Sequence, residues 1–178
     1  MQARPLLIRS AHPSDAQAIA EVHVRGWQWG YRDLLPADVL DSLSVDRREQ
    51  GWIEILTSLP PGATVLVATV RDERIVGFAG VGPRRDEDAL EETGELSSLY
   101  IEEEVADTGV GRALMKAAID FARDSGYREL TLWVLERNSR ARQFYEAAGL
   151  RPDGSSKAEM HPVVPVLLEE VRYRRSLP

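Results

Sequence analysis

The amino-acid sequence predicts a single α/β domain, and two observations support this prediction. Segments with the apolar spacing of strands alternate with segments that have the spacing of amphipathic helices. A chain of 178 residues is also long enough for one well-packed core and short for two. The sequence contains neither an internal repeat nor a low-complexity stretch. We therefore expect one domain over residues 1–178.

Apolar periodicity predicts most of the elements, and breaker residues predict where they end. Pro60 and Pro61 close a helical region, the turn at 71–73 indicates a hairpin, and Gly126 and Gly149 end helices. The predicted order is strand 6–9, a helix from residue 13, helices 34–43 and 45–59, strands 63–70, 74–81 and 94–101, helix 110–125, strand 128–134, helix 138–148, and strands 155–160 and 166–174. The acidic segment 83–92 is expected to be an exposed loop.

The charge and residue types of the chain exclude several function classes. The formal net charge of −7 argues against nucleic acid as a partner, because a phosphate backbone requires a basic surface. The same charge is compatible with a cationic, amine-bearing substrate. The sequence has no cysteine, which excludes disulfides, thiolate metal ligands and a cysteine nucleophile. His12, His23 and His161 lack the spacing of metal ligands, so no metal is expected.

The hydropathy of the chain indicates no membrane partner. No apolar run approaches the roughly 20 residues that a membrane-spanning helix needs. The apolar stretch within residues 1–9 is too short for a signal peptide. A cytoplasmic location is therefore expected.

Two glycines mark the turn between strand 94–101 and helix 110–125. Gly109 and Gly111 stand at the entrance of this helix, where the first backbone amides have no intrahelical partner and the helix dipole is positive. Glycine also lets a phosphate group approach the backbone closely. This turn alone is weak evidence, since glycines also serve ordinary tight turns.

A second run, at 138–150, strengthens the evidence from the glycine turn. It reads Asn-x-x-Ala-x-x-Phe-Tyr-x-x-x-Gly-Leu, with Asn138, Ala141, Phe144, Tyr145, Gly149 and Leu150 at the named positions. Together the two runs resemble the GNAT superfamily of N-acetyltransferases. In that family the phosphate loop reads Gln/Arg-x-x-Gly-x-Gly/Ala and the later helix reads Asn-x-x-Ala-x-x-Phe-Tyr-x-x-x-Gly-Phe. The resemblance extends over most of the chain, which is similar to a broad group of bacterial members of this family.

The resemblance implies the GNAT fold, a mixed central sheet splayed between its fourth and fifth strands and flanked by helices. It also implies acetyl-CoA as co-substrate and no metal. In the family the pantetheine arm lies in the splay and pairs with the main chain of the fourth strand, which here corresponds to Leu99, Tyr100 and Ile101. Without the glycine turn beside it, 94–101 would be interpreted as a plain buried strand.

The resemblance further implies that the pyrophosphate lies on the backbone of the glycine turn. The corresponding residues are Asp107, Thr108, Gly109, Val110, Gly111 and Arg112. The turn departs from the family pattern, because Ala106 stands where Gln or Arg is usual and Asp107 adds a carboxylate. Such a carboxylate costs about 1 kcal/mol or less per exposed pair at physiological salt. An acyl-CoA-binding, regulatory member without turnover is therefore the alternative to an enzyme.

The later helix carries the leading catalytic candidate. In the family the tyrosine that corresponds to Tyr145 often donates a proton or hydrogen bond to the departing CoA thiolate. The alternative is that Tyr145 is another core aromatic. Asn138 opens the same helix, where it can cap free amides, and the matching asparagine in the family contacts the cofactor.

Glu95 is the first candidate for the general base that takes the proton of the acceptor amine. Many relatives carry a glutamate directed at the cleft from the matching position of the fourth strand. Other members place the base on the fifth strand, where this chain has Trp133, and Glu136 is the second candidate. The alternative for Glu95 is a solvated carboxylate at a strand end.

The segment 24–36 combines aromatic residues with glycines and corresponds to the acceptor wall of GNAT relatives. Trp27 and Tyr31 are its expected contacts with substrate, because cations bind favourably over such rings. Packing alone could explain one indole.

The predicted function is transfer of acetyl from acetyl-CoA to a primary amine of a small molecule or peptide. Direct attack is expected, because no cysteine exists to carry a covalent intermediate. Transfer of another acyl group stays open, and so does the acceptor, since variable loops set acceptor choice. A homodimer is possible, because the apolar segment 163–171 is either an interior strand or an exposed edge.

Overall fold

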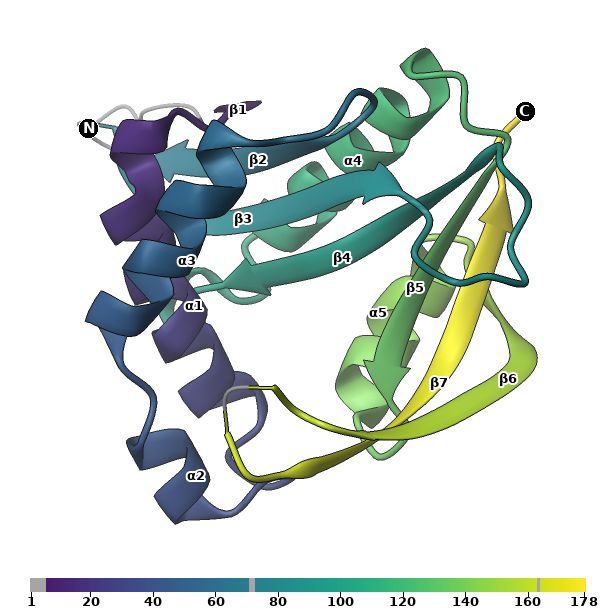
Figure 1. The fold of residues 1–178 in the computed structure, drawn as a ribbon. Coiled ribbons are helices and arrows are strands. Elements are labelled where there is room, and N and C mark those ends of the chain that lie inside the picture. Colours follow the sequence, from purple (N-terminus) through teal and green to yellow (C-terminus); the bar gives the residue numbers. More distant parts are fainter. Residues whose placement is uncertain (1–5, 71–72, 163) are drawn as a thin grey trace.

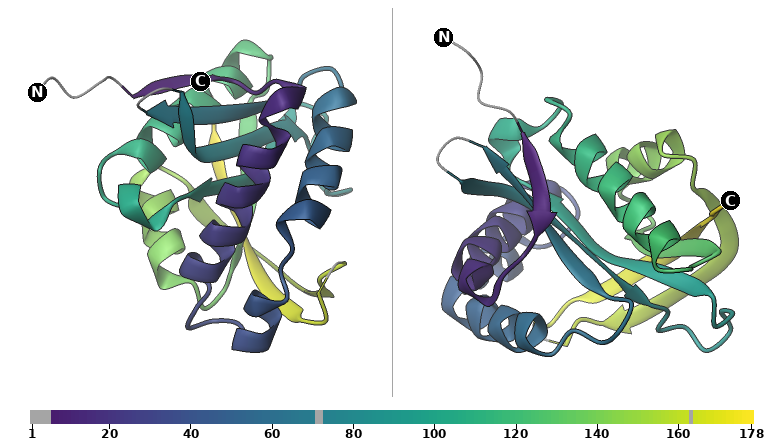
Figure 2. Two further views of the ribbon diagram at one scale, coloured as in Figure 1. Left: turned by 90° about the vertical axis from the view of Figure 1, so that its left-hand side faces the viewer. Right: turned by 90° about the horizontal axis from the view of Figure 1, so that it is seen from above.

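A seven-stranded sheet runs through the molecule, with helices on both of its faces (Figures 1 and 2). The computed structural model describes residues 6–70, 73–162 and 164–178. Residues 1–5, the turn residues 71–72 and Val163, which entered the predictions above, lie outside these ranges. The predicted α/β class is confirmed.

The elements follow in an order close to the predicted one. In chain order they are β1 (Leu7–Ser10), η1 (Pro13–Asp15), α1 (Ala16–Gly30), α2 (Ala37–Asp41), α3 (Val45–Thr57), β2 (Thr64–Val70), β3 (Arg74–Pro83), β4 (Thr93–Ile101), η2 (Glu103–Val105), α4 (Val110–Asp124), β5 (Glu129–Leu135), α5 (Ser139–Ala147), β6 (Arg151–Met160) and β7 (Leu167–Ser176). The glycines predicted to end α4 and α5 have positive φ angles, +88° at Gly126 and +86° at Gly149.

Two boundaries differ from the prediction for physical reasons. The helix expected at 34–43 is only α2, because Leu34 and Leu35 precede Pro36 and a residue before proline avoids the helical region. The strand expected at 155–160 begins earlier, at Arg151, because β7 continues past a bulge and pairs Tyr173 with Pro152. This long-range pairing leaves no local signal in the sequence.

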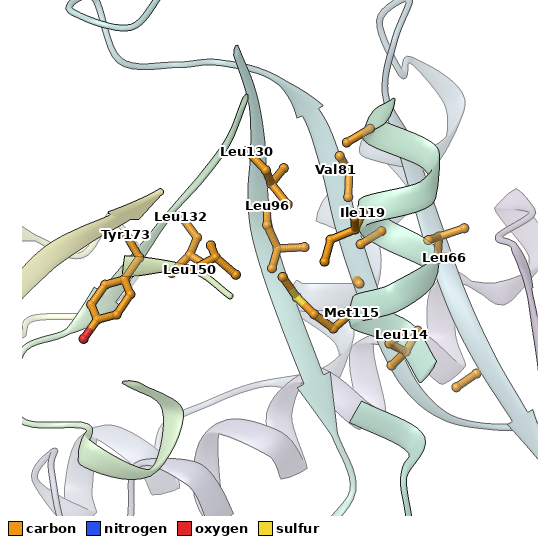
Figure 3. Packing of buried hydrophobic residues seen from close by; sticks show 14 of the residues in the cluster. Leu66, Val81, Leu96, Leu114, Met115, Ile119, Leu130, Leu132, Leu150 and Tyr173 are labelled. Atoms are coloured by element: carbon orange, nitrogen blue, oxygen red, sulfur yellow. The ribbon is translucent and has the colours of Figure 1, made fainter. Parts of the chain in front are cut away.

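The core lies on both faces of the sheet. On one face α4 buries Leu114, Met115 and Ile119 against Leu96 of β4 and Leu130 of β5 (Figure 3). On the other face α1 and α3 cover β2 and β3, and Ile19, Trp52 and Phe78 belong to that second cluster. Helices α1 and α3 lie together on one side of the sheet, and α4 and α5 lie on the other (Figure 2). No helix among the described residues combines the length and the apolar character needed to cross a membrane.

Strands β4 and β5 are paired only over a short stretch. They are the parallel neighbours of an otherwise antiparallel sheet in the order β1-β2-β3-β4-β5-β7-β6. Their register contains Thr93↔Glu129, Gly94↔Leu130 and Glu95↔Thr131, after which the strands diverge (Figure 1). The predicted splay between the fourth and fifth strands is confirmed.

Glu95 stands at the last paired position before the strands separate. Its side chain is buried, with 2% of the residue exposed. Arg85 donates its backbone N–H (3.0 Å) and its side-chain Nε (2.9 Å) to the carboxylate, and its Nη2 also contacts that carboxylate. Glu95 therefore joins β4 to the segment after β3, which differs from the solvated strand end considered as its alternative.

The acidic segment 83–92, predicted to be an exposed loop, is mostly exposed, and it is also anchored to the sheet. Arg172 of β7 is 3% exposed and donates to Asp86 (3.1 Å), Asp88 (2.7 Å) and Asp153 (2.7 Å). Ala89 is buried as well. The pairing of arginine with these carboxylates could not be seen from the segment itself, because its partner lies far along the chain.

We predict that Glu95→Gln destabilises the protein, because the substitution keeps the volume but replaces a charged acceptor of Arg85 by an amide. Hydrogen bonds to charged groups contribute about 1.5–3 kcal/mol, so the free energy of unfolding should fall by an amount in this range. Urea denaturation followed by circular dichroism measures it. Glu92→Gln is the matched control, since the Glu92 side chain is 66% exposed and lies 3.9 Å from Arg128. Equal stability of the two variants would contradict the structural role of Glu95.

Candidate active site

A cavity of about 930 Å³ opens where β4 and β5 diverge. Its walls come from the end of α1, the second half of β4, the entrance of α4, the end of β5 and the start of α5, with one residue of β7. The two glycine-containing motifs of the sequence, far apart along the chain, therefore lie at the same cavity.

The entrance of α4 offers backbone amides to this cavity. Gly109 caps the helix with a φ angle of +97°, and Ala113 makes the first helical hydrogen bond, to the carbonyl of Gly109. The amides of residues 110–112 consequently have no intrahelical partner. Of the residues predicted to hold the pyrophosphate, Gly109, Gly111 and Arg112 line the cavity. Such an amide cluster at the positive end of a helix dipole is suited to bind phosphate.

Gly111 separates α4 from α5. A Cβ atom at this position would lie 3.4 Å from the ring of Phe144 and 3.9 Å from Ile101. A methyl group would thus be in contact at once, and a branched side chain would collide with Phe144. Gly111 therefore leaves little room for a larger side chain at the point where α4 faces Phe144 of α5.

The remaining residues of the glycine turn point in different directions. Val110 is buried in the core, and the Thr108 hydroxyl donates to the carbonyl of Val105 at 2.7 Å, so neither side chain lines the cavity. Asp107 does line it, with a φ angle of +61° and a side chain that is 94% exposed.

A cation partly offsets the carboxylate of Asp107. Arg140 of α5 lies 3.8 Å from Asp107 and stacks over the ring of Trp29 at 4.2 Å. Arg112 and Arg137 line the same cavity. This end of the cavity therefore carries several guanidinium groups near the free amides of α4. The turn nevertheless has Ala106 at the position where the family pattern has Gln or Arg.

The open edge of β4 faces the gap left by β5. Glu102 donates its backbone N–H to Val76 of β3. The alternation of a strand then directs the backbone N–H and C=O of Ile101 and Leu99 away from β3, toward the cavity. The main chain of Tyr100 points toward β3 instead. Of the three residues predicted to pair with the pantetheine arm, Leu99 and Ile101 therefore direct backbone groups to the cavity, where an extended ligand could pair with them.

Helix α5 brings Asn138 and Tyr145 to the opposite wall. The Asn138 side chain accepts a hydrogen bond from the Ala141 amide at 3.0 Å, which confirms its predicted capping role. Tyr145 lines the cavity, and no described residue is hydrogen-bonded to its hydroxyl. Burial raises the pKa of Tyr145, and the neighbouring Tyr100 adds to this shift. The phenol therefore stays protonated at physiological pH and can donate a hydrogen bond.

Tyr31 and Tyr100 form an aromatic wall beside Tyr145. Their hydroxyls lie 3.3 Å apart, and both residues line the cavity. Burial raises the pKa of each hydroxyl. Tyr100 stacks on His23, whose own pKa is lowered to about 3 by burial, so this imidazole is neutral. The wall is a set of uncharged rings and hydroxyls.

Trp27, predicted to contact the acceptor, does not line the cavity. It is 5% exposed and packs edge to face on Tyr31 (5.0 Å) and His161 (5.0 Å). The reason is that α1 continues to Gly30, which turns Trp27 into the core and Trp29 to the cavity. The structure thus places Trp27 behind the wall, and it brings Tyr31 to the surface of the wall.

The structure places both acidic residues considered as general base, Glu95 and Glu136, away from the cavity. Glu95 lies outside the lining and is paired with Arg85, and Glu136 is exposed and outside the lining as well. Trp133 occupies the β5 wall, as expected. Glu170 of β7 lines the cavity, and sequence analysis missed it because no motif surrounds it and the neighbouring Glu169 looks the same in the sequence.

Comparison with known proteins agrees with this architecture. Residues 19–150 match the family model described as acetyltransferase (GNAT) family. The uncharacterised N-acetyltransferase YuaI of Bacillus subtilis is 35% identical over 131 residues, which cover 74% of this chain and 72% of that protein.

Two solved structures share the fold. The putative acetyltransferase YncA of Salmonella typhimurium, solved with its cofactor acetyl-CoA, has a TM-score of 0.71 at 20% identity and covers 98% of this chain and 95% of its own. The PaiA N-acetyltransferase of Thermoplasma acidophilum, solved in complex with coenzyme A, has a TM-score of 0.70 at 19% identity and covers 97% and 99%. The chain therefore belongs to the acetyltransferase (GNAT) family, and the predicted enzyme class, an acetyltransferase, is confirmed.

Proposed function

We propose that this enzyme transfers the acetyl group of acetyl-CoA to a primary amine of a small molecule or peptide by direct attack. The observation that carries the proposal is the hydroxyl of Tyr145, which has no hydrogen-bond partner among the described residues and stands at the cavity between the diverging strands. A protonated phenol at that point can serve a leaving thiolate.

Several features support acetyl-CoA as the donor. YncA and PaiA, which share the fold, were solved with acetyl-CoA and coenzyme A. In this chain the amides of residues 110–112 and the guanidinium groups of Arg112 and Arg140 would hold the phosphates. The open edges of Leu99 and Ile101 would pair with the pantetheine arm. The donor supplies an activated acetyl thioester.

The proposed chemistry needs no covalent enzyme intermediate. The neutral amine attacks the thioester carbonyl carbon, a C–N bond forms and the C–S bond breaks. Tyr145 donates a proton to the sulfur, and the proton lost by the attacking nitrogen restores the phenol. The hydroxyls of Tyr31 and Tyr100 form the acceptor side of the cavity.

Release of free CoA thiol from acetyl-CoA in the presence of a panel of primary amines tests the proposal. Amine-dependent thiol release, with an acetylated product seen by mass spectrometry, is the expected result. Binding of acetyl-CoA without turnover for any amine would favour the regulatory alternative. Faster turnover with a longer acyl-CoA would correct the acyl group.

Replacing Tyr145 by Phe is predicted to lower kcat by a factor on the order of 10²–10⁴, because the ring stays and only the proton donor is lost. Acetyl-CoA affinity should change little. Steady-state kinetics and calorimetry measure the two effects. Tyr127→Phe is the matched control, since its hydroxyl donates to the carbonyl of Gly62 (2.9 Å), away from the cavity. Normal kcat in Tyr145→Phe, with chemistry limiting turnover, would reduce Tyr145 to a packing role.

A second prediction concerns Gly111, at the point where α4 faces α5. Gly111→Val should weaken acetyl-CoA binding about tenfold or more, because the branched side chain meets Phe144; tenfold corresponds to about 1.4 kcal/mol. Calorimetric titration with acetyl-CoA measures it. Gly51→Val controls for the change of residue type, since a Cβ at Gly51 meets nothing within 4 Å. Equal affinity of the two folded variants would remove Gly111 from the donor site.

A third prediction concerns the charge of Asp107 in the glycine turn. Asp107→Asn should tighten CoA binding by up to about fivefold at low salt, because a repulsion of about 1 kcal/mol or less is removed and Arg140 is released from its carboxylate partner. Asparagine also tolerates the positive φ of this position. The gain should shrink as salt rises. Asp124→Asn, at the far end of α4, changes the net charge equally and should leave affinity unchanged.

A further inference from the structure

Glu170 is the carboxylate that the structure brings to the acceptor side of the cavity. It lies on β7 opposite Leu135 of β5 and Lys157 of β6. Among the described lining residues, Asp33 and Asp107 are the other carboxylates, and both are exposed to solvent. The side chain of Glu170 is 20% exposed. Its position is therefore sheltered, as a proton acceptor in an acyl-transfer site should be.

The surroundings of Glu170 are mostly uncharged on the cavity side. Tyr31, just after α1, and Tyr100 from β4 share the lining with it. Burial is the main cause of the raised pKa of both hydroxyls, and the negative charge of Glu170 adds to each shift. Trp133 of β5 closes the wall. A cationic amine that enters this space would meet one sheltered carboxylate and aromatic rings, both of which favour a cation.

The charged groups on the sheet side are balanced. Lys157 of β6 approaches Glu170 at 3.6 Å while its ammonium group lies over the ring of Trp133 at 4.5 Å. Glu159 of β6 and Arg85, after β3, act on Glu170 with opposite signs. Burial outweighs the cations and raises the pKa of Glu170 above its usual range. A carboxylate with a raised pKa is the stronger base in its ionised form.

We propose that Glu170 accepts the proton of the acceptor ammonium group. This inference rests on the function proposed above and names the acceptor class as primary amines that reach the site as cations. In the step, Glu170 takes one proton from R–NH₃⁺, directly or through one water, and the freed lone pair attacks the thioester. Glu170 later releases that proton to solvent. The net reaction converts ammonium and acetyl-CoA into amide, CoA thiol and one proton.

Glu95, the candidate favoured by the family resemblance, is a poor alternative on this geometry. Its carboxylate is held by three donors of Arg85 and lies outside the cavity lining. A carboxylate that is fully paired in this way cannot accept a substrate proton without losing those contacts. Glu170 has Lys157 at the edge of hydrogen-bond distance and an open face toward the cavity.

The test is a pH profile of Glu170→Gln, with the amine that gives the fastest thiol release in the wild type. The variant should lose about 10²–10⁴-fold in kcat/KM near pH 7, and the loss should shrink as pH approaches the amine pKa of about 10.4, where the amine is already neutral. Acetyl-CoA affinity should stay unchanged. In the wild type, the rate should fall as pH drops through the raised pKa of Glu170, because protonation removes the base.

Two further variants keep the proposal testable. Glu169→Gln makes the same chemical change one residue away, on an exposed side chain outside the lining, and should behave as wild type. Lys157→Met keeps a side chain of similar length beside Trp133 but removes the cation that favours ionised Glu170. Its acidic limb should therefore move to higher pH, a result that does not depend on how well Glu170→Gln folds.

The outcomes separate the two proposals. Full activity or a pH-independent loss in Glu170→Gln, together with an unmoved limb in Lys157→Met, would overturn the role of Glu170 and leave amine acetylation standing. Absence of thiol release from wild-type enzyme with every amine would overturn the function and this inference together.

Discussion

The brief pairing of β4 with β5 is the constraint on which the rest of the molecule depends. The two strands share only the pairs from Thr93↔Glu129 to Glu95↔Thr131, and beyond them each strand keeps its other neighbour. Close packing at the pairing point is secured by Gly94, where a Cβ would lie 2.8 Å from the Tyr127 ring. Past that point the backbone of β4 is left with an unused edge. The cavity is lined around this divergence by residues of α1, β4, α4, β5, α5 and β7.

Two buried charged groups near the divergence of β4 and β5 are paired with opposite charges. The buried carboxylate of Glu95 is neutralised by Arg85, and the buried guanidinium of Arg172 is surrounded by aspartates of the segment after β3 and of β6. Buried charges are costly unless they are paired. These pairs join β4, β6 and β7 to the segment after β3, whereas Glu170 is less completely paired. The difference in pairing separates the structural acid from the acid proposed for chemistry.

The donor and acceptor sides of the cavity differ in their electrostatics. The entrance of α4 combines free amides with Arg112 and Arg140, which suits a polyanion. The aromatic wall of Tyr31 and Tyr100 with Glu170 suits a cation. Tyr145 lines the same cavity as a neutral hydrogen-bond donor. In the proposed reaction, an anionic donor and a cationic acceptor would bind at opposite ends of this cavity.

Local sequence determined the features that depend on near neighbours. The positive φ of Gly109, the cap at Asn138 and the glycine ends of α4 and α5 follow from backbone sterics and hydrogen bonds within a few residues, and the motif with Tyr145 predicted its helix. Tertiary structure alone decided which side chains face the cavity. Trp27 turns inward because α1 continues to Gly30 and its inner face packs in the core, and Glu95 meets Arg85 because β3 and β4 pair there. Glu170 reaches the cavity because β7 lies beside β5, and successive strand residues face opposite sides, so only the register distinguishes it from Glu169.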